Sequence, residues 1–290
     1  MFSGAFTAIV TPFKDGQVDE KGLRNLIRFG IDGGVSGFIP CGTTGESPTL
    51  SYEEHHRVIE LTVKEVAGQV KVIAGTGSNS TSEAISLTKH AKKAGADAAL
   101  LVSPYYNKPT QEGLFKHFAA VAEAVDIPLI LYNIQGRTSV NIENSTVQRL
   151  SKIQNIVGVK EASGSILQMS EVIRLCGPEF DVLSGDDQMT FPLMALGGKG
   201  VISVVTNIIP DRMSSLVRHM LAGEIEKARA IHFEIFELCQ TMFCETNPIP
   251  IKAALGLMGK IEPEFRLPLC APSAANLDKI RTVLSKFDLV

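Results

Sequence analysis

Residues 156–163 read Ile-Val-Gly-Val-Lys-Glu-Ala-Ser, a short apolar, largely β-branched run that turns polar at Lys160. Such a run predicts a buried strand, with Lys160 at or near its carboxyl end. A buried ammonium is costly unless it is paired, and burial lowers its pKa toward the neutral amine. The neutral amine is the nucleophile that condenses with a ketone to form a Schiff base. The alternative is that Lys160 marks the hydrated edge of the strand, because lysines are usually exposed.

Short apolar runs of this kind alternate with longer amphipathic stretches up to about residue 222. The predicted strands are residues 5–10, 37–39, 70–74, 98–102, 128–132, 156–160, 181–183 and 200–204. The predicted helices are residues 19–32, 51–67, 81–94, 111–124, 144–150, 165–176, 188–196 and 211–222. Strands that alternate with helices imply a parallel α/β sheet, and eight such units can close into a (β/α)8 TIM barrel. A doubly wound open sheet ranks second, because no G-x-G-x-x-G turn follows the first strand.

The strand pattern stops after Gly223. Residues 224–243, 248–259 and 273–287 then read as three helices. We therefore predict a catalytic barrel over residues 1–223 and a small C-terminal three-helix appendage over residues 224–290, whose role we take to be structural.

Composition excludes several classes of function. The 290 residues carry a net charge of −3, which gives no electrostatic signature for nucleic acid or for an anionic membrane. No apolar run approaches the roughly 18 residues that a membrane span needs, and the first residues lack a signal-peptide pattern. The five cysteines form no C-x-x-C, and the six histidines form no H-E-x-x-H. We expect a cytoplasmic protein without a catalytic metal.

In a barrel, active residues lie at the carboxyl ends of strands and in the loops that follow them. The second strand leads into residues 40–47, Pro-Cys-Gly-Thr-Thr-Gly-Glu-Ser. The backbone amides of such a loop could bind a carboxylate. Loops rich in glycine and threonine are, however, also common where no ligand binds. Residues 103–109, after the fourth strand, hold two of the four tyrosines. Tyr132 closes the fifth strand, where a lone tyrosine would more often fill the core with a hydrated tip.

Four motifs carry a resemblance to a known family. They are G-T-T-G-E-S at 42–47, S-P-Y-Y-N at 103–107, Y-N-x-x-x-R-T at 132–138 and G-V-K-E-A-S at 158–163. In this order they resemble the 4-hydroxy-tetrahydrodipicolinate synthase (dihydrodipicolinate synthase) family, class I aldolases of the N-acetylneuraminate lyase type, and the resemblance covers the whole chain. It implies that pyruvate condenses with L-aspartate 4-semialdehyde through a lysine Schiff base, in lysine and diaminopimelate biosynthesis, with no cofactor.

The resemblance also implies catalytic roles. Lys160 resembles the lysine that forms the imine with pyruvate, and Tyr132 the tyrosine that moves protons. Thr43 resembles the hydroxyl that relays those protons toward Tyr106. In the family that tyrosine reaches in from a neighbouring subunit. The resemblance therefore implies a homo-oligomer whose tight unit is a dimer, with two such dimers forming a homotetramer.

Four further positions resemble substrate-binding residues. Thr44 corresponds to the residue that holds the pyruvate carboxylate, and Arg137 to the arginine that takes the carboxylate of aspartate semialdehyde. Gly185 and Ile202 match positions that line the pyruvate pocket through their backbones. The family usually has Val-Pro where residues 134–135 are Ile-Gln, so the loop that carries Arg137 is less constrained here.

Part of the family is inhibited by lysine. The residues that resemble its allosteric pocket are Ser47, His55, Asn79, Glu83 and Tyr105. Pro48 and Tyr52 stand where inhibited bacterial enzymes tend to have alanine and histidine, so the sequence leaves regulation open.

Two other functions compete with this interpretation. The first is a sister aldolase that uses the same lysine–pyruvate imine on sialic acid or on a keto-deoxy sugar acid. Arg137 disfavours it, because a polyhydroxy substrate would call for neutral hydrogen-bonding groups. The second is an inactive barrel that senses small acids, which would have no need to keep Lys160, Tyr132, Thr43 and Tyr106 together.

Overall fold

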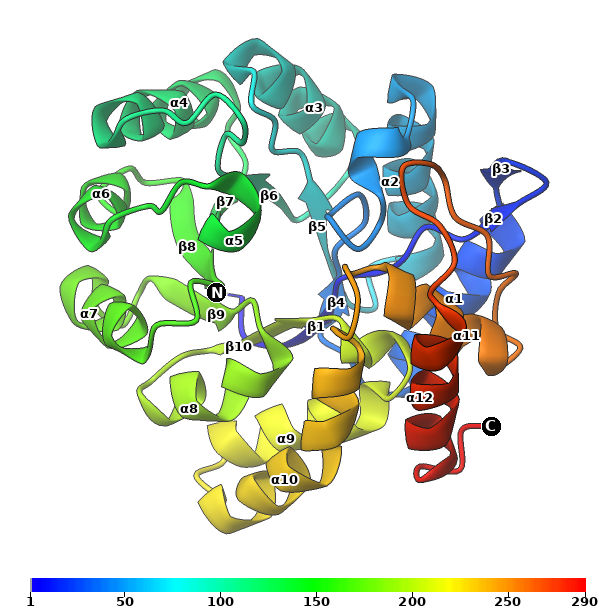
Figure 1. Cartoon of the computed structure of the whole chain (residues 1–290). Helices are drawn as coiled ribbons and strands as arrows, with labels where there is room; N and C mark the ends of the chain where they lie inside the picture. Colours follow the sequence, from blue (N-terminus) through cyan, green and yellow to red (C-terminus); the bar gives the residue numbers. More distant parts are fainter. Residues whose placement is uncertain (1) are drawn as a thin grey trace.

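The computed structural model describes residues 2–290, and its centre is a closed barrel of eight parallel strands (Figure 1). The order around the barrel is β1, β10, β9, β8, β7, β6, β5 and β4, and β4 pairs with β1 to close it. The strands are β1 (Gly4–Thr7), β4 (Gly37–Phe38), β5 (Lys71–Gly75), β6 (Ala98–Val102), β7 (Leu129–Asn133), β8 (Ile156–Glu161), β9 (Asp181–Ser184) and β10 (Gly200–Ser203). The predicted (β/α)8 barrel is confirmed, and an open sheet is excluded.

Helices form a ring outside the barrel (Figure 1). They are α1 (Glu20–Asp32), α2 (Tyr52–Val66), α3 (Thr81–Ala94), α4 (Gln111–Ala124), α6 (Asn144–Leu150), α7 (Ile166–Cys176), α8 (Thr190–Ala195) and α9 (Pro210–Leu221). The start of α2 is a capping box, in which Ser51 and Glu54 each bond the other's backbone amide. The end of α3 is fixed by Gly95, whose φ of +91° suits a residue without a Cβ. None of the described helices is long and apolar enough to cross a membrane.

The core has two parts because side chains of a strand alternate between its faces. Side chains that point inward fill the barrel, and they include Phe6, Ile39, Ile73, Leu100, Ile130 and Ile202. Side chains that point outward, such as Leu129, Leu131 and Val159, pack with helix residues. Within β8, this alternation turns Lys160 inward and Val159 outward.

Several short elements were not predicted from the sequence. A hairpin joins β2 (Phe13–Lys14) to β3 (Gln17–Val18). Three 3-10 segments are η1 (Ser47–Thr49), η2 (Asp187–Met189) and η3 (Val205–Asn207), and α5 (Gln135–Thr138) is a helix of one turn. The predicted helix 188–196 was wrong at its start, where the structure has the 3-10 segment η2 in place of α-helix. The Asp186 side chain stabilises this segment by accepting a hydrogen bond from the Gln188 amide.

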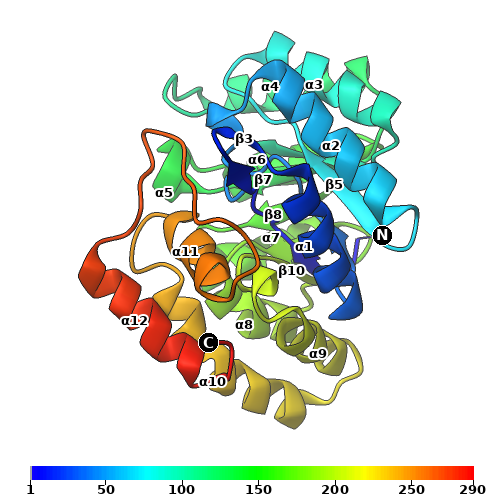
Figure 2. The same cartoon turned by 90° about the vertical axis from the view of Figure 1, so that its right-hand side faces the viewer.

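The C-terminal helices pack on one flank of the barrel (Figure 2). They are α10 (Ile225–Thr241), α11 (Ile249–Leu257) and α12 (Ala274–Ser285). Their buried residues, Leu238 and Ile251 among them, belong to the same apolar cluster as Ile9 and Leu23 of the barrel. The division into two parts at Gly223 stays a prediction.

Candidate active site

Lys160 and Tyr132 lie directly opposite each other on neighbouring strands. They are paired in the register of β8 with β7, and the Lys160 Nζ lies 4.2 Å from the centroid of the Tyr132 ring. Both side chains are buried, with 6% and 5% of their surface exposed. The structure therefore excludes a lysine at a hydrated strand edge.

Burial changes the acid–base chemistry of Lys160. It lowers the pKa of the ammonium to about 7, an effect that the nearby Asp187 carboxylate partly opposes and the Arg137 guanidinium reinforces. A large fraction of Lys160 is then the neutral amine near pH 7. The residue is thus able to attack a carbonyl carbon without a separate base to deprotonate it.

Asp187 is a buried carboxylate that sequence reasoning missed. Its Oδ2 accepts hydrogen bonds from the amides of Val204 and Val205, at 3.1 and 3.3 Å. Burial raises the pKa of Asp187 to about 6. Its place just after the carboxyl end of β9 was the signal that could have drawn attention to it.

Gly185 leaves the space that the Lys160 side chain occupies. A Cβ at Gly185 would lie 3.0 Å from Lys160 Cε, 3.1 Å from Lys160 Cγ and 2.7 Å from the Ala162 Cβ. Ile202, on β10, belongs to the apolar cluster inside the barrel that also contains Tyr132. Both predicted pocket positions thus lie on the same inner surface as the lysine.

Residues 40–47, which we call the Gly-Thr-Thr loop, bring two hydroxyls to this region. Thr43 lines a cavity together with Tyr132, and Thr44 is buried with its Oγ1 accepting a hydrogen bond from Asn247 Nδ2 at 3.0 Å. Burial raises the pKa of the Tyr132 phenol to about 12, while the charge of Arg137 and a hydrogen bond with Thr43 act in the opposite direction. Tyr132 is therefore a protonated hydroxyl that can donate and pass on a proton.

The cavity has a volume of about 650 Å³, and Arg137 is one of the residues that line it. Lys160 is not among the residues that line it, but Tyr132, whose ring faces the lysine amine, is. Arg137 lies on α5 and is exposed, and its Nη2 donates to the backbone oxygen of Asn247 at 2.8 Å. This contact holds the arginine at the cavity although the proline usual in the family is absent.

Tyr106 is separated from the other predicted catalytic residues within one chain. It is 90% exposed, has a φ of +73° and is not among the residues that line the cavity. The structure of the single chain therefore brings together Lys160, Tyr132 and Thr43 but not Tyr106.

The same cavity contains most of the residues of the predicted lysine pocket. Ser47, His55, Glu83 and Tyr105 line it, and Asn79 lies beside it, donating from Nδ2 to the Tyr105 backbone oxygen at 3.2 Å. The Glu83 carboxylate is already hydrogen-bonded by two hydroxyls, those of Tyr52 and Ser78.

Within residues 2–290, no three His, Cys, Asp or Glu side chains gather in a way that could hold a metal ion. The site described above combines a buried amine, hydroxyl groups and an arginine. These groups suit imine formation on Lys160, proton transfer by Tyr132 and the binding of carboxylates.

The chain is similar to known proteins along its whole length. The model of the dihydrodipicolinate synthetase family matches residues 1–287. A 4-hydroxy-tetrahydrodipicolinate synthase of Syntrophus aciditrophicus is 58% identical over 290 residues, which is 100% of both chains. The crystal structure of dihydrodipicolinate synthase from Aquifex aeolicus has a TM-score of 0.98 at 52% identity, covering 99% of each chain. That of the chloride-inhibited enzyme of Acinetobacter baumannii, complexed with pyruvate, has a TM-score of 0.98 at 46% identity over 100% of each chain.

Proposed function

Because the chain belongs to the dihydrodipicolinate synthetase family, we propose that it condenses pyruvate with L-aspartate 4-semialdehyde to give 4-hydroxy-tetrahydrodipicolinate. The observation that carries this proposal is the buried Lys160, whose amine has a pKa near 7 and faces the Tyr132 ring. The reaction is a lyase-type condensation on the route to diaminopimelate and lysine.

The first half of the reaction builds a nucleophile from pyruvate. The neutral amine of Lys160 adds to the ketone carbon, the resulting hydroxyl leaves as water, and an imine remains. Loss of a proton from the methyl carbon then gives an enamine. Tyr132 and Thr43 are the hydroxyls placed to carry these protons, because both line the cavity and the Thr43 side chain is close enough to lower the pKa of Tyr132.

The second half joins the two substrates and closes the ring. The enamine carbon attacks the aldehyde carbon of aspartate semialdehyde, whose oxygen takes up a proton and becomes a hydroxyl. The amino group of that substrate then attacks the imine carbon and displaces Lys160, which leaves as the free amine. One water is released over the cycle, and no electrons are gained or lost.

Two carboxylates have to be held while this happens. Thr44 and the amides of the Gly-Thr-Thr loop take the carboxylate of pyruvate, and Gly185 and Ile202 line the same subsite. Arg137 takes that of aspartate semialdehyde at the cavity mouth, where a charge-assisted contact selects an acidic aldehyde. A sister aldolase acting on a polyhydroxy acid is disfavoured by the same arginine.

A direct comparison of turnover tests this function. Pyruvate and aspartate semialdehyde should be consumed together by the purified protein. The same preparation should not cleave N-acetylneuraminate or a 2-keto-3-deoxy sugar acid at a comparable rate. Faster cleavage of either sugar acid would replace the proposed function by the sister activity.

The same proposal includes a homo-oligomer. Tyr106 is too exposed in the single chain to take part in a proton relay, and a hydroxyl supplied to the partner's Thr43 would account for its position. We take the assembly to be a homotetramer made of two tight dimers. The cytoplasmic location expected from the cysteine pattern belongs to the proposal as well.

We propose that lysine inhibits this protein only weakly. The Tyr52 hydroxyl already occupies the Glu83 carboxylate, which is the group in this pocket suited to an amino group. Lysine therefore has to displace an existing hydrogen bond, and inhibition should be weak. Titration of the activity with lysine tests this: strong inhibition in the wild type, unchanged in Tyr52→Phe, would contradict it.

A further inference from the structure

A fully buried ion pair joins the Gly-Thr-Thr loop to the C-terminal appendage. Glu46 lies near the end of the loop and Lys252 lies on α11, and the Lys252 Nζ donates to Glu46 Oε1. Neither side chain has any exposed surface. Two charges are costly to remove from water, so such a pair calls for good geometry and further partners.

Further partners are present on both sides of the pair. The Lys252 Nζ lies 4.3 Å from the centroid of the Phe13 ring, and the backbone amide of Arg266 donates to Glu46 Oε2 at 3.3 Å. Both carboxylate oxygens of Glu46 are therefore bonded by residues of the appendage. These partners lie more than 200 residues further along the chain.

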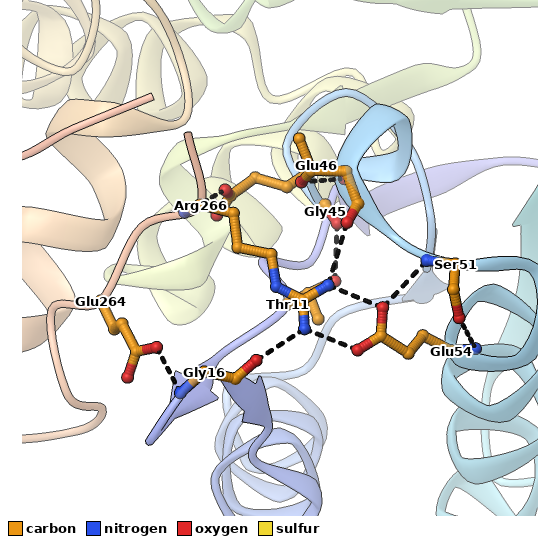
Figure 3. Close-up of polar contacts among 9 residues, drawn as sticks. Thr11, Gly16, Gly45, Glu46, Ser51, Glu54, Glu264 and Arg266 are labelled. Carbon is orange, nitrogen blue, oxygen red and sulfur yellow. Dashed lines mark hydrogen bonds and ion pairs between the residues drawn. The ribbon is translucent and has the colours of Figure 1, made fainter. Parts of the chain in front are cut away.

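The Arg266 side chain extends this connection to neighbouring segments (Figure 3). Its guanidinium donates to the backbone oxygens of Thr49 and Gly16, both at 2.9 Å, and forms a salt bridge with Glu54 at the start of α2. The segment around Arg266 thus bonds the residues that follow the Gly-Thr-Thr loop as well as Glu46 itself.

The loop needs external contacts to keep its shape. Cys41 and Glu46 have φ values of +57° and +51°, in the left-handed region that residues other than glycine rarely adopt. Such conformations persist only where the surroundings determine them. From the barrel, Thr11 Oγ1 donates to the Gly45 oxygen at 2.7 Å, the Gly75 amide donates to the Pro40 oxygen at 2.9 Å, and Cys41 Sγ donates to the His55 oxygen at 3.5 Å. The hydrogen bonds to the side chains of Thr44 and Glu46 come from the appendage, from Asn247, Lys252 and Arg266.

We propose that the C-terminal appendage sets the geometry of the pyruvate-binding loop through the buried Glu46–Lys252 pair, which makes both residues positioning residues for the first substrate. The inference rests on the proposed function, because it takes Thr43 and Thr44 as groups that act on pyruvate. It gives the appendage a part in the active site, in addition to the structural role that the sequence suggested.

A double variant, Glu46→Leu with Lys252→Met, tests the proposal. It removes both charges at once and keeps their volume, a change that usually leaves a protein folded. We expect the KM for pyruvate to rise tenfold or more and borohydride trapping of pyruvate at subsaturating concentration to slow by a similar factor. The KM for aspartate semialdehyde should change by less than twofold, because Arg137 is held by Asn247 and not by the pair.

A matched control removes another ion pair of the appendage. Lys286, the residue directly after α12, pairs with Glu237 of α10 on the surface, with side chains 52% and 57% exposed. The double variant Glu237→Leu with Lys286→Met should behave like the wild type in both assays. Wild-type pyruvate kinetics in the folded Glu46 and Lys252 double variant would overturn the proposal, and so would equal rises in both KM values.

If the double variant does not fold, the single variant Glu46→Gln tests the proposal instead. It keeps the shape of the side chain and an acceptor for Lys252 but removes the charge, so the pyruvate KM should rise by a smaller factor, about threefold. An unchanged pyruvate KM in Glu46→Gln would overturn the proposal. Failure of the wild type itself to be trapped by pyruvate and borohydride would refute the proposed function and would remove the basis of this inference.

Discussion

Replacing Gly185 by alanine tests whether the shape around Lys160 is required for activity. The φ of Gly185 lies outside the left-handed region, so alanine adds no backbone strain and acts only through its Cβ. That Cβ would lie 2.7 Å from the Ala162 Cβ and 3.0 Å from Lys160 Cε. The Ala162 Cβ cannot rotate away, so the short segment after β8 has to shift, and the flexible end of Lys160 is pushed aside as well. Both movements displace the lysine amine.

The size of the effect follows from these overlaps. Crowding a well-packed core typically costs about 1–3 kcal/mol of unfolding free energy. A displacement of about 1 Å at a reacting atom can cost roughly 100-fold in rate. For Gly185→Ala we therefore expect a folded protein whose kcat, and whose rate of trapping by pyruvate and borohydride, fall between about tenfold and 100-fold.

The assay combines thermal unfolding, steady-state kinetics and the time course of trapping. Gly136→Ala is the matched control, because a Cβ at Gly136 on α5 would meet nothing within 4 Å. The control should keep the wild-type kcat. Unchanged kinetics in folded Gly185→Ala would refute the reasoning, since the lysine would then not depend on the space that the glycine leaves.

The remaining predictions concern the second substrate, acid–base chemistry and assembly. Arg137→Ala should raise the KM for aspartate semialdehyde about tenfold or more, through loss of roughly 1.5–3 kcal/mol, while pyruvate trapping persists; loss of trapping would contradict the assignment. With the pKa of Lys160 near 7, the neutral-amine fraction and the trapping rate should fall about fivefold from pH 7 to pH 6. Asp187→Asn removes a charge that raises the pKa of Lys160, so the midpoint of the pH dependence of trapping should move to lower pH. A shift of that midpoint to higher pH would argue against the role of Asp187. Mixing inactive Tyr106→Phe with inactive Lys160→Ala subunits should restore part of the activity after dissociation and reassociation, and no recovery despite subunit exchange would show that each chain uses its own tyrosine.

The barrel could be predicted because its signals are local. Each strand is an apolar run between polar residues, as in residues 98–102, and the helix start at Ser51 carries its own capping residues. The hairpin of β2 and β3 escaped notice because each strand has only two residues, too few to show alternation. Helix α5 escaped because one turn has no periodicity, and Arg137 within it is bonded to the distant Asn247.

The candidate site also has residues that the sequence could predict and residues that it could not. Lys160 and Tyr132 could be singled out because each polar group ends an apolar strand, and the resemblance supplied the roles of Thr43 and Thr44. The contact of Asn247 with Thr44 and the pairing of Lys252 with Glu46 join residues more than 200 positions apart. No local pattern marks such partners, so they became visible only when the chain was folded.

The central claim is that Lys160 forms a Schiff base with pyruvate, and one measurement tests it most directly. The protein is incubated with pyruvate and borohydride, and the modified residue is located by mass spectrometry of its peptides. The account predicts one reduced pyruvyl group per chain, on Lys160, and no label in Lys160→Ala. A label on another lysine, or no label on the wild type, would contradict it.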